Sequence, residues 1–156
     1  MAIIVPQLHE FLGKNIDTIC PNGYAAPHDN HCAHFVSHAM GFRFGYTCQA
    51  ATSGKSPGAN LRVHELFSRC SAVGGWTDRP AALMNGCLVF VTAGSHVNLA
   101  AKVMANVPQK HVGIFRNGTI WHYSNAHHRV VTEQPTQFVH HYHGPGIELF
   151  YGQFPQ

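Results

Sequence analysis

The dipeptide Asn117-Gly118 limits the folds open to this chain more than any other feature. It separates two apolar-rich runs, residues 111–116 and 119–124. A type I′ turn needs positive φ at both of its central residues, a conformation that Asn and Gly tolerate. The pattern therefore predicts a β-hairpin with a short two-residue loop, and with it an antiparallel sheet in the second half of the chain.

The register of this hairpin sorts its side chains between two faces. With a two-residue loop, Arg116 pairs with Thr119. Further along the strands His111 pairs with Ser124, and His122 then lies diagonally across from His111 on the same face. The opposite face is predicted to carry apolar side chains, those of Val112, Ile114, Trp121 and Tyr123. One face thus suits a packed core, and on the other the two imidazoles are close enough to interact.

Helical patterns come first along the chain and strand patterns follow. Apolar residues recur at helical spacing in segments 6–14, 32–40 and 61–70, and the second helix is predicted to begin after Asp29 or Asn30 and to end at Gly41. Residues 99–105 are expected to add a short helix. Short apolar runs predict strands at 87–92, 111–116, 119–124, 129–133 and 147–151. The predicted fold class is α+β, with N-terminal helices packed on an antiparallel β-meander.

The composition favours a single domain, residues 1–156, with a substantial core. Of 156 residues, 45% are apolar and only 11% are charged, which suits a compact domain of ordinary size. The net charge is +3 with His counted neutral. Lys and Arg are scattered and form no basic run, so we expect no nucleic-acid partner. The fourteen histidines would raise the charge at mildly acidic pH.

Cysteine usage and the N-terminal segment bear on where the protein acts. Five cysteines, an odd number without a Cys-x-x-Cys pair, do not suggest a disulfide-stapled domain, and at least one thiol is expected to be free. Residues 1–15 lack the basic start and apolar stretch of a signal peptide, and no segment has the pattern of a transmembrane helix. We expect no membrane insertion, and action outside the producing cell would need a non-classical export route.

Cys32 is the candidate nucleophile because it begins a predicted helix. The partial positive charge of a helix N-terminus and a nearby imidazolium both favour the thiolate, the reactive form of cysteine. The alternative is a buried structural thiol. The remaining cysteines lie before a proline, in a loop, at a helix end and at the start of an apolar strand, in the order Cys20, Cys48, Cys70 and Cys87. A cysteine nucleophile followed later in the sequence by two histidines, here His111 and His122, is typical of a cysteine hydrolase site.

The order of these motifs resembles that of the NlpC-type cell-wall peptidases and their CHAP relatives, in the papain-like cysteine peptidase superfamily. Residues 31–37, His-Cys-Ala-His-Phe-Val-Ser, are similar to their Asp-Cys-Ser-Gly-Phe-Val-Ser helix start. Residues 86–90, Gly-Cys-Leu-Val-Phe, and residues 111–115, His-Val-Gly-Ile-Phe, resemble their Gly-Asp-Leu-Val-Phe and His-Val-Gly-Ile-Tyr strands. The likeness extends over roughly residues 20–133 and implies the papain-like, NlpC-type fold.

The resemblance implies a role for four residues. Cys32 is the nucleophile, His111 the general base and His122 the residue that orients it, while Tyr24 joins the Cys32 backbone N–H in binding the oxyanion. The implied reaction is hydrolysis of amide bonds in peptidoglycan stem peptides through an acyl-enzyme, without a metal or other cofactor. The implied context is either an antibacterial effector, whose partner would be an inhibitory immunity protein, or a phage-type lysin.

Two alternatives stay open. The first is a zinc site, because His34 and His38 are four residues apart on a predicted helix with His31 and Cys32 close by. Further histidines stand at positions 127, 128, 140, 141 and 143. The second is a binding module or an acyl-transferring enzyme on the same fold, because His31 and His34, which flank Cys32, replace the Asp and Gly of the resembling family. Cys87 also stands where that family has an Asp.

Overall fold

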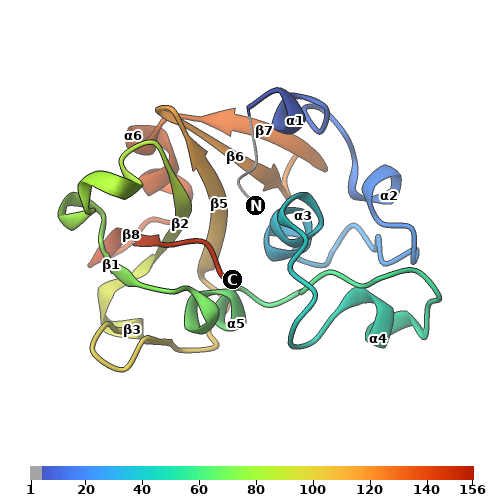
Figure 1. Ribbon diagram of the computed structural model, residues 1–156, viewed down its shortest axis with the longest axis horizontal. Coiled ribbons are helices and arrows are strands. Elements are labelled where there is room, and N and C mark those ends of the chain that lie inside the picture. The colour runs from blue at the N-terminus through green and yellow to red at the C-terminus, as the bar shows by residue number, and fades with distance from the viewer. Residues whose placement is uncertain (1–4) are drawn as a thin grey trace.

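A six-stranded antiparallel sheet forms the centre of the computed structural model, which describes residues 5–156. Its strand order is β1-β8-β2-β5-β6-β7 (Figure 1). β5, β6 and β7 follow one another as a meander, whereas β8 returns to lie between β1 and β2. The strands of the sheet are β1 (Val73–Gly75), β2 (Gly86–Ala93), β5 (Lys110–Arg116), β6 (Thr119–Ser124), β7 (Arg129–Glu133) and β8 (Ile147–Gly152), and a separate pair is formed by β3 (Val97–Asn98) and β4 (Val103–Met104).

Short helices lie on both sides of this sheet (Figure 1). They are α1 (Val5–His9), α2 (Ile16–Ile19), α3 (Cys32–Met40), α4 (Cys48–Thr52), α5 (Val63–Arg69) and α6 (Pro135–Phe138), with the 3₁₀ helices η1 (Trp76–Asp78), η2 (Ala81–Leu83), η3 (Gly94–His96) and η4 (Val139–His141). In Figure 1, α3 lies on one side of the sheet with α2 and α4 beyond it, and α6 lies on the other side. The fold is therefore mixed α+β, as the sequence predicts.

The predicted hairpin turn joins β5 to β6. Asn117 and Gly118 have φ angles of 49° and 86°, the left-handed values that a type I′ turn requires. Arg116 pairs with Thr119 across the loop. The two-residue loop and its starting register are thus confirmed.

The two strands separate beyond this turn. Pairing ends at Ile114 and Trp121, so the predicted pair of His111 and Ser124 does not form. In this region α3 packs against β5, and Cys32 and Val112 belong to the same core.

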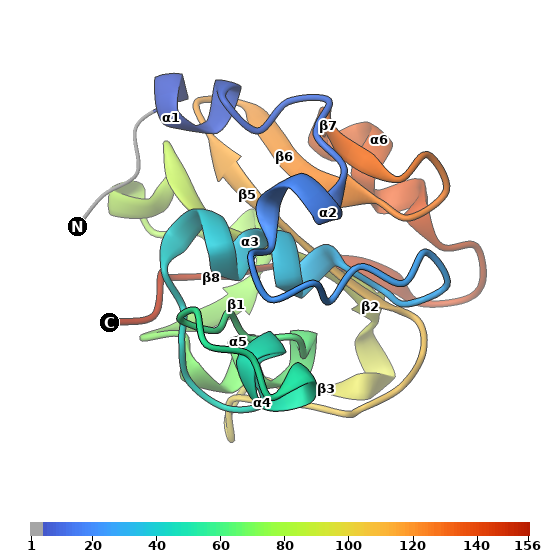
Figure 2. The same cartoon turned by 90° about the vertical axis from the view of Figure 1, so that its right-hand side faces the viewer.

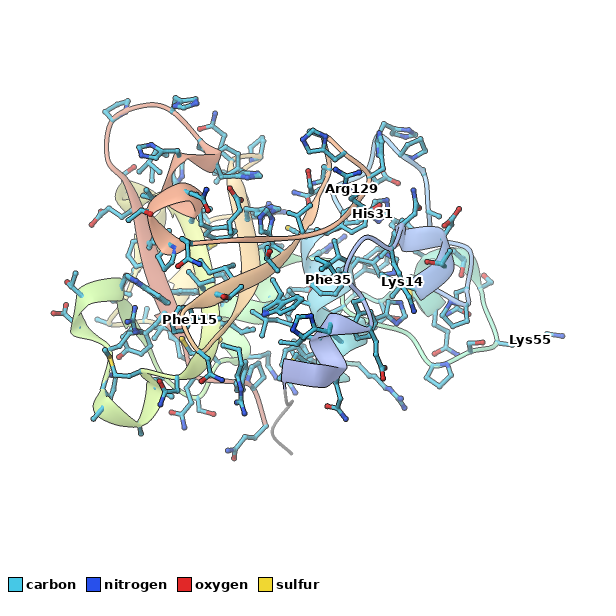
Figure 3. The ribbon with its side chains drawn as sticks, turned by 90° about the horizontal axis from the view of Figure 1, so that it is seen from above. Lys14, His31, Phe35, Lys55, Phe115 and Arg129 are labelled. Atoms are coloured by element: carbon cyan, nitrogen blue, oxygen red, sulfur yellow. The ribbon has the colours of Figure 1, made fainter. Side chains whose placement is uncertain are left out.

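The two faces of the sheet bury separate cores. Phe35 of α3 belongs to one core and is 0% exposed, while Phe115 of β5 belongs to the other and is 4% exposed. Figure 3 shows these two side chains on opposite sides of the sheet. Burying each ring contributes about 1.5–3 kcal/mol to stability. His111 and His122 share the face of Phe115, since both of their rings pack against Phe138 of α6.

Helix α3 begins at Cys32 and ends where the sequence predicts. Gly41 adopts a φ of 78°, and its N–H donates to the carbonyl of Ser37 at 2.8 Å, as in a glycine C-terminal cap. The N-cap residue is His31 rather than the predicted Asp or Asn. Asn30 nevertheless holds the helix start, because its side-chain oxygen accepts the Cys32 N–H at 3.0 Å.

The helix predicted over 99–105 does not form, and that segment belongs to the β3–β4 hairpin. The side-chain oxygen of Asn98 accepts the N–H of Ala101 at 3.0 Å, and Lys102 has a φ of 58°. A local bond from side chain to backbone stabilises a turn in competition with a helix. The Ala-rich composition of the segment therefore gave the wrong prediction.

Other boundaries also differ from the sequence prediction. The first helix ends at His9 and the third covers Val63–Arg69. Cys48, predicted in a loop, begins α4, because the Thr47 hydroxyl accepts the Ala50 N–H at 3.3 Å and caps that helix. Within residues 5–156, none of the helices has the length and apolar character to cross a bilayer. Residues 1–4 of the N-terminal segment lie outside the described residues.

Candidate active site

Cys32 is the first residue of α3, and only 1% of its surface is exposed. Burial raises the pKa of its thiol to about 11, although the nearby backbone N–H groups of Val112 and Ala33 act in the opposite direction. The predicted lowering of this pKa at a helix start is thus outweighed by desolvation. The thiol packs in the same core as Val112 of β5.

His111 lies on β5 and is 0% exposed. Its Nε2 is 3.0 Å from Nδ1 of His122, so the structure brings together the two histidines that the sequence places on one face. Its other ring nitrogen, Nδ1, is buried without a hydrogen-bond partner among the described residues. Burial holds the pKa of His111 well below 6.5, which keeps the ring neutral at physiological pH.

Glu133 of β7 completes a chain of three side chains. Nε2 of His122 lies 2.5 Å from Oε1 of Glu133, and this hydrogen bond lowers the pKa of the carboxyl. A carboxylate only accepts, so His122 donates from Nε2 and its Nδ1 accepts the Nε2–H of His111. The unpartnered Nδ1 of His111 therefore carries a lone pair, which is what a general base needs.

The side chains of Cys32 and His111 lie on opposite faces of the sheet. The thiol belongs to the core on the α3 side, whereas the ring of His111 packs on Phe138 at a centroid distance of 5.5 Å. The exposed ring of His141 stacks on His111 at 3.9 Å with an interplanar angle of 11°. Among the described contacts, none joins the Cys32 sulfur to the His111 ring, and the ring of His141 covers that of His111.

The predicted oxyanion groups have other partners. The Cys32 N–H is bonded to Asn30, whose side chain also accepts from Asn125 at 2.9 Å. Tyr24 packs its ring against His31 and His34, at centroid distances of 5.8 and 5.4 Å. None of its described contacts is with Cys32. In this conformation Tyr24 belongs to the far side of α3, and substrate would have to displace the Asn30 amide from the Cys32 N–H.

Four surface cavities, about 360 to 700 Å³ in volume, open on other parts of the molecule. Among the described residues that line them, none is Cys32, His111 or His122. The segment after α6 closes the site, since the hydroxyl of Tyr142 donates to the carbonyl of Lys110 at 3.0 Å. The thiol itself is buried in the core on the α3 side.

A second group of polar side chains lies across α3 from the sheet. His34 and His38, the pair considered for zinc, meet with Nε2 atoms 3.1 Å apart, and burial lowers their pKa values to about 3 and about 4. Their neighbours are Cys20 and Cys48, and the four potential ligand atoms lie within 4.8 Å of one another. Cys32 is not in this group. The histidines at 127, 128, 140, 141 and 143 contribute to no such group within residues 5–156.

Comparison with protein-family models, with curated proteins and with solved structures finds no match to this chain. The likeness to NlpC-type peptidases therefore stays a resemblance of motifs. Assignment of a function depends on the chemistry of the two side-chain groups described above.

Sequence reasoning missed Glu133, Cys20 and Cys48 as site residues. One signal for Glu133 was available, since β7 pairs with β6 so that His122 is opposite Val131. Residues two apart on a strand share a face, so that register puts Glu133 diagonally beside His122. The two cysteines gave no comparable signal, because they lie 14 residues before His34 and 10 after His38 in the sequence.

Proposed function

We propose that this protein is a cysteine hydrolase with an NlpC-type, papain-like site, in which Cys32 attacks an amide carbonyl and His111 moves the proton. The single observation that carries the proposal is the hydrogen-bond chain from Glu133 through His122 to His111. A buried chain of this kind orients a base and stabilises its protonated form. A merely structural histidine pair does not need the carboxylate.

The chain assigns the reacting atom of the base. Because Glu133 accepts and His122 relays, the lone pair of His111 is on Nδ1, the nitrogen without a described partner. The thiol of Cys32 lies on the α3 side of β5 and the His111 ring on the other, so the proposal requires the two groups to come together when the site opens. Proton transfer from sulfur to this Nδ1 would make an imidazolium whose charge is offset by the Glu133 carboxylate.

The proposed reaction then follows in two stages. Sulfur forms a bond to the substrate carbonyl carbon as its proton passes to His111, since burial disfavours a free thiolate. The N-terminus of α3 favours the oxyanion, whose oxygen takes the Cys32 N–H from Asn30. His111 protonates the leaving amine, and water then hydrolyses the thioester with His111 as base.

The proposed substrate class is the peptide amide, and the family resemblance narrows it to stem peptides of peptidoglycan. The biological context that fits is a secreted antibacterial effector, with an immunity protein as its inhibitory partner, or a phage-type lysin. The burial of both Cys32 and His111 fits an enzyme that opens when it meets its substrate. Tyr24 remains the proposed side-chain contribution to the oxyanion site after such opening.

The test is mass spectrometry of purified muropeptides after digestion. Wild type should release a new peptide end, and Cys32→Ala and His111→Ala should not. Cys87→Ala is the matched control, because this cysteine is also buried but lies on the face of the sheet away from α3. Products formed by Cys32→Ala, or none formed by wild type across linear and cross-linked muropeptides, would contradict the proposal and favour a non-hydrolytic binding module.

A further inference from the structure

We propose that Cys20, His34, His38 and Cys48 bind one Zn²⁺ ion in a tetrahedral site that anchors the loops around α3. The site is separate from the proposed catalytic chain and does not depend on it. A set of two sulfur and two imidazole ligands is the donor set of structural zinc.

The four side chains come from segments that meet only in the folded chain. Cys20 follows α2, His34 and His38 lie one helical turn apart on α3, and Cys48 begins α4. Figure 2 shows α3 running between α2 and α4. Residues four apart on a helix point the same way, so the two imidazoles face the gap that the cysteines enter from either side.

The distances suit a tetrahedral ion. With Zn–N of about 2.0–2.1 Å and Zn–S of about 2.3 Å, ligand atoms stand roughly 3.3 Å apart for two nitrogens and roughly 3.6 Å for nitrogen and sulfur. Nε2 of His34 and Nε2 of His38 are 3.1 Å apart, and Nε2 of His38 is 3.7 Å from Sγ of Cys48. The remaining pairs lie within 4.8 Å. Small side-chain adjustments suffice to close the tetrahedron.

Hydrogen bonding fixes the tautomer of His34 for this role. The carbonyl of Ala26 only accepts, so Nε2 of His31, 2.7 Å away, carries a hydrogen. In the neutral ring Nδ1 of His31 then accepts from Nδ1 of His34, at 3.1 Å. The lone pair of His34 is therefore on Nε2, which faces the cluster. A ligand histidine held through its other nitrogen is the usual arrangement around bound zinc.

The sulfur atoms are placed to carry negative charge. Sγ of Cys48 receives the N–H of Ala59 at 3.3 Å and the side-chain amide of Asn22 at 3.7 Å. Burial raises the pKa of the Cys20 thiol, and the nearby backbone N–H groups of Tyr24 and Asn22 act in the opposite direction. Hydrogen bonds to a sulfur favour its deprotonated form, and zinc binds cysteine as thiolate.

The surroundings of the cluster explain what the metal would contribute. The core here consists of only three buried apolar residues, Cys20, Cys48 and Ala59, with partly buried neighbours. α2 and α4 are 4 and 5 residues long, too short to be stable without tertiary support. A metal held by all three segments would fasten these loops to α3, the helix that also presents Cys32.

The competing explanation is a pair of reduced thiols that oxidise to a Cys20–Cys48 disulfide. Both cysteines are free in the structure, and their sulfur atoms lie within 4.8 Å of each other. A disulfide would join the two loops but give no role to the His34 lone pair that Ala26 and His31 set in place. Zinc uses all four groups, and so accounts for the whole arrangement.

The test is metal analysis of untagged protein purified under reducing conditions, without added zinc. We expect one zinc per chain by mass spectrometry of the metal, released by a thiol-modifying reagent, and at least tenfold less in Cys48→Ser and His38→Ala. Cys87→Ala, a buried cysteine remote from the cluster, should retain the full amount. The readout does not involve enzyme activity.

Wild-type protein stripped by a chelator provides a measurement that does not depend on folding of the variants. Co²⁺ added to it should give the visible absorption of a tetrahedral site and thiolate-to-metal charge transfer, and Zn²⁺ should abolish both in a one-to-one titration. Absence of these bands in folded wild type would overturn the proposal. So would a Cys20–Cys48 disulfide in the isolated protein together with no zinc in its reduced form, or equal zinc in Cys48→Ser and Cys87→Ala.

Discussion

Helix α3 separates two chains of hydrogen-bonded histidines that are built alike and end differently. On one side His111 is held by His122 and then by the carboxylate of Glu133. On the other side His34 is held by His31 and then by the carbonyl of Ala26. Each chain ends on an oxygen that only accepts, so each leaves one imidazole lone pair at its far end.

The difference between the two chains is the charge at the closing oxygen. A carboxylate can stabilise a proton that arrives on the histidines, so the His111 chain suits proton transfer. A carbonyl has no net charge to offset an imidazolium, so the His34 chain suits a neutral metal ligand. In both chains two imidazole rings are hydrogen-bonded to each other. The group that ends the chain, a carboxylate or a carbonyl, decides whether the pair suits proton transfer or metal binding.

The largest expected effect comes from removing the negative charge of Glu133. In Glu133→Gln an amide replaces the carboxylate and can donate to Nε2 of His122, which reverses the tautomers along the chain to His111. We expect kcat on a muropeptide substrate to fall roughly 10³–10⁴-fold, by analogy with neutralised carboxylates in catalytic triads. The matched control is Glu148→Gln, on the edge of β8 that faces Gly94, with kcat unchanged. An equal loss in both variants would refute a catalytic role for Glu133.

A smaller effect is expected from the chain that ends on Ala26. His31→Phe keeps an aromatic ring beside Tyr24 but cannot accept from His34, so zinc affinity should fall about 10–100-fold, the usual cost of losing an outer hydrogen bond. His31→Gln can both donate and accept, and should lose less. Competition with a chromophoric chelator measures both. Equal affinity in the two variants would show that the orienting bond is unimportant.

The dependence of folding stability on acidic pH tests whether the buried His111 ring is neutral. Burial holds its pKa well below 6.5, so the unfolded chain takes up the proton first as the pH falls. The stability that the neutral ring provides is fully present above about pH 6.5 and declines below it, by up to ~1.4 kcal/mol per pH unit. His111 is faced by His122 and His141, which repel an added proton as well.

The measurement is the free energy of unfolding in urea at several pH values below 6.5. His111→Asn should show a shallower decline than wild type. The control His28→Gln, a side chain 84% exposed, should leave the slope unchanged. Buried His34 and His38 contribute equally to all three proteins, so the difference isolates His111. Identical slopes in wild type and His111→Asn would contradict a buried neutral ring.

The smallest effect concerns the β5–β6 turn, which lies next to the proposed catalytic histidines and not next to the proposed zinc site. Gly118 has a φ of 86°, a conformation that costs about 1–2 kcal/mol for an L-residue with a side chain. Gly118→Ala should lower the free energy of unfolding by about that amount and reduce activity, with zinc content unchanged. Thermal unfolding and metal analysis of the same sample check this. Loss of zinc in Gly118→Ala would show that the two regions are coupled.

Local chemistry explains which features were predictable. The Asn117-Gly118 turn, the Gly41 helix end and the placement of His111 and His122 on one face depend on neighbours in sequence, and all three are confirmed. The predicted helix over 99–105 is wrong for a local reason too, the side chain of Asn98. In that segment helix propensity and turn formation compete within a few tenths of a kcal/mol per residue.

The amino-acid sequence by itself determined the α+β class, the hairpin and the candidates Cys32, His111 and His122, because periodicity and turn preference act over a few residues. Only the tertiary structure decided that Glu133 ends one histidine chain and that Cys20 and Cys48 close around His34 and His38. It also decided that the thiol is buried with a raised pKa. Strand register between distant segments and desolvation are properties of the whole packed chain, and no local pattern contains them.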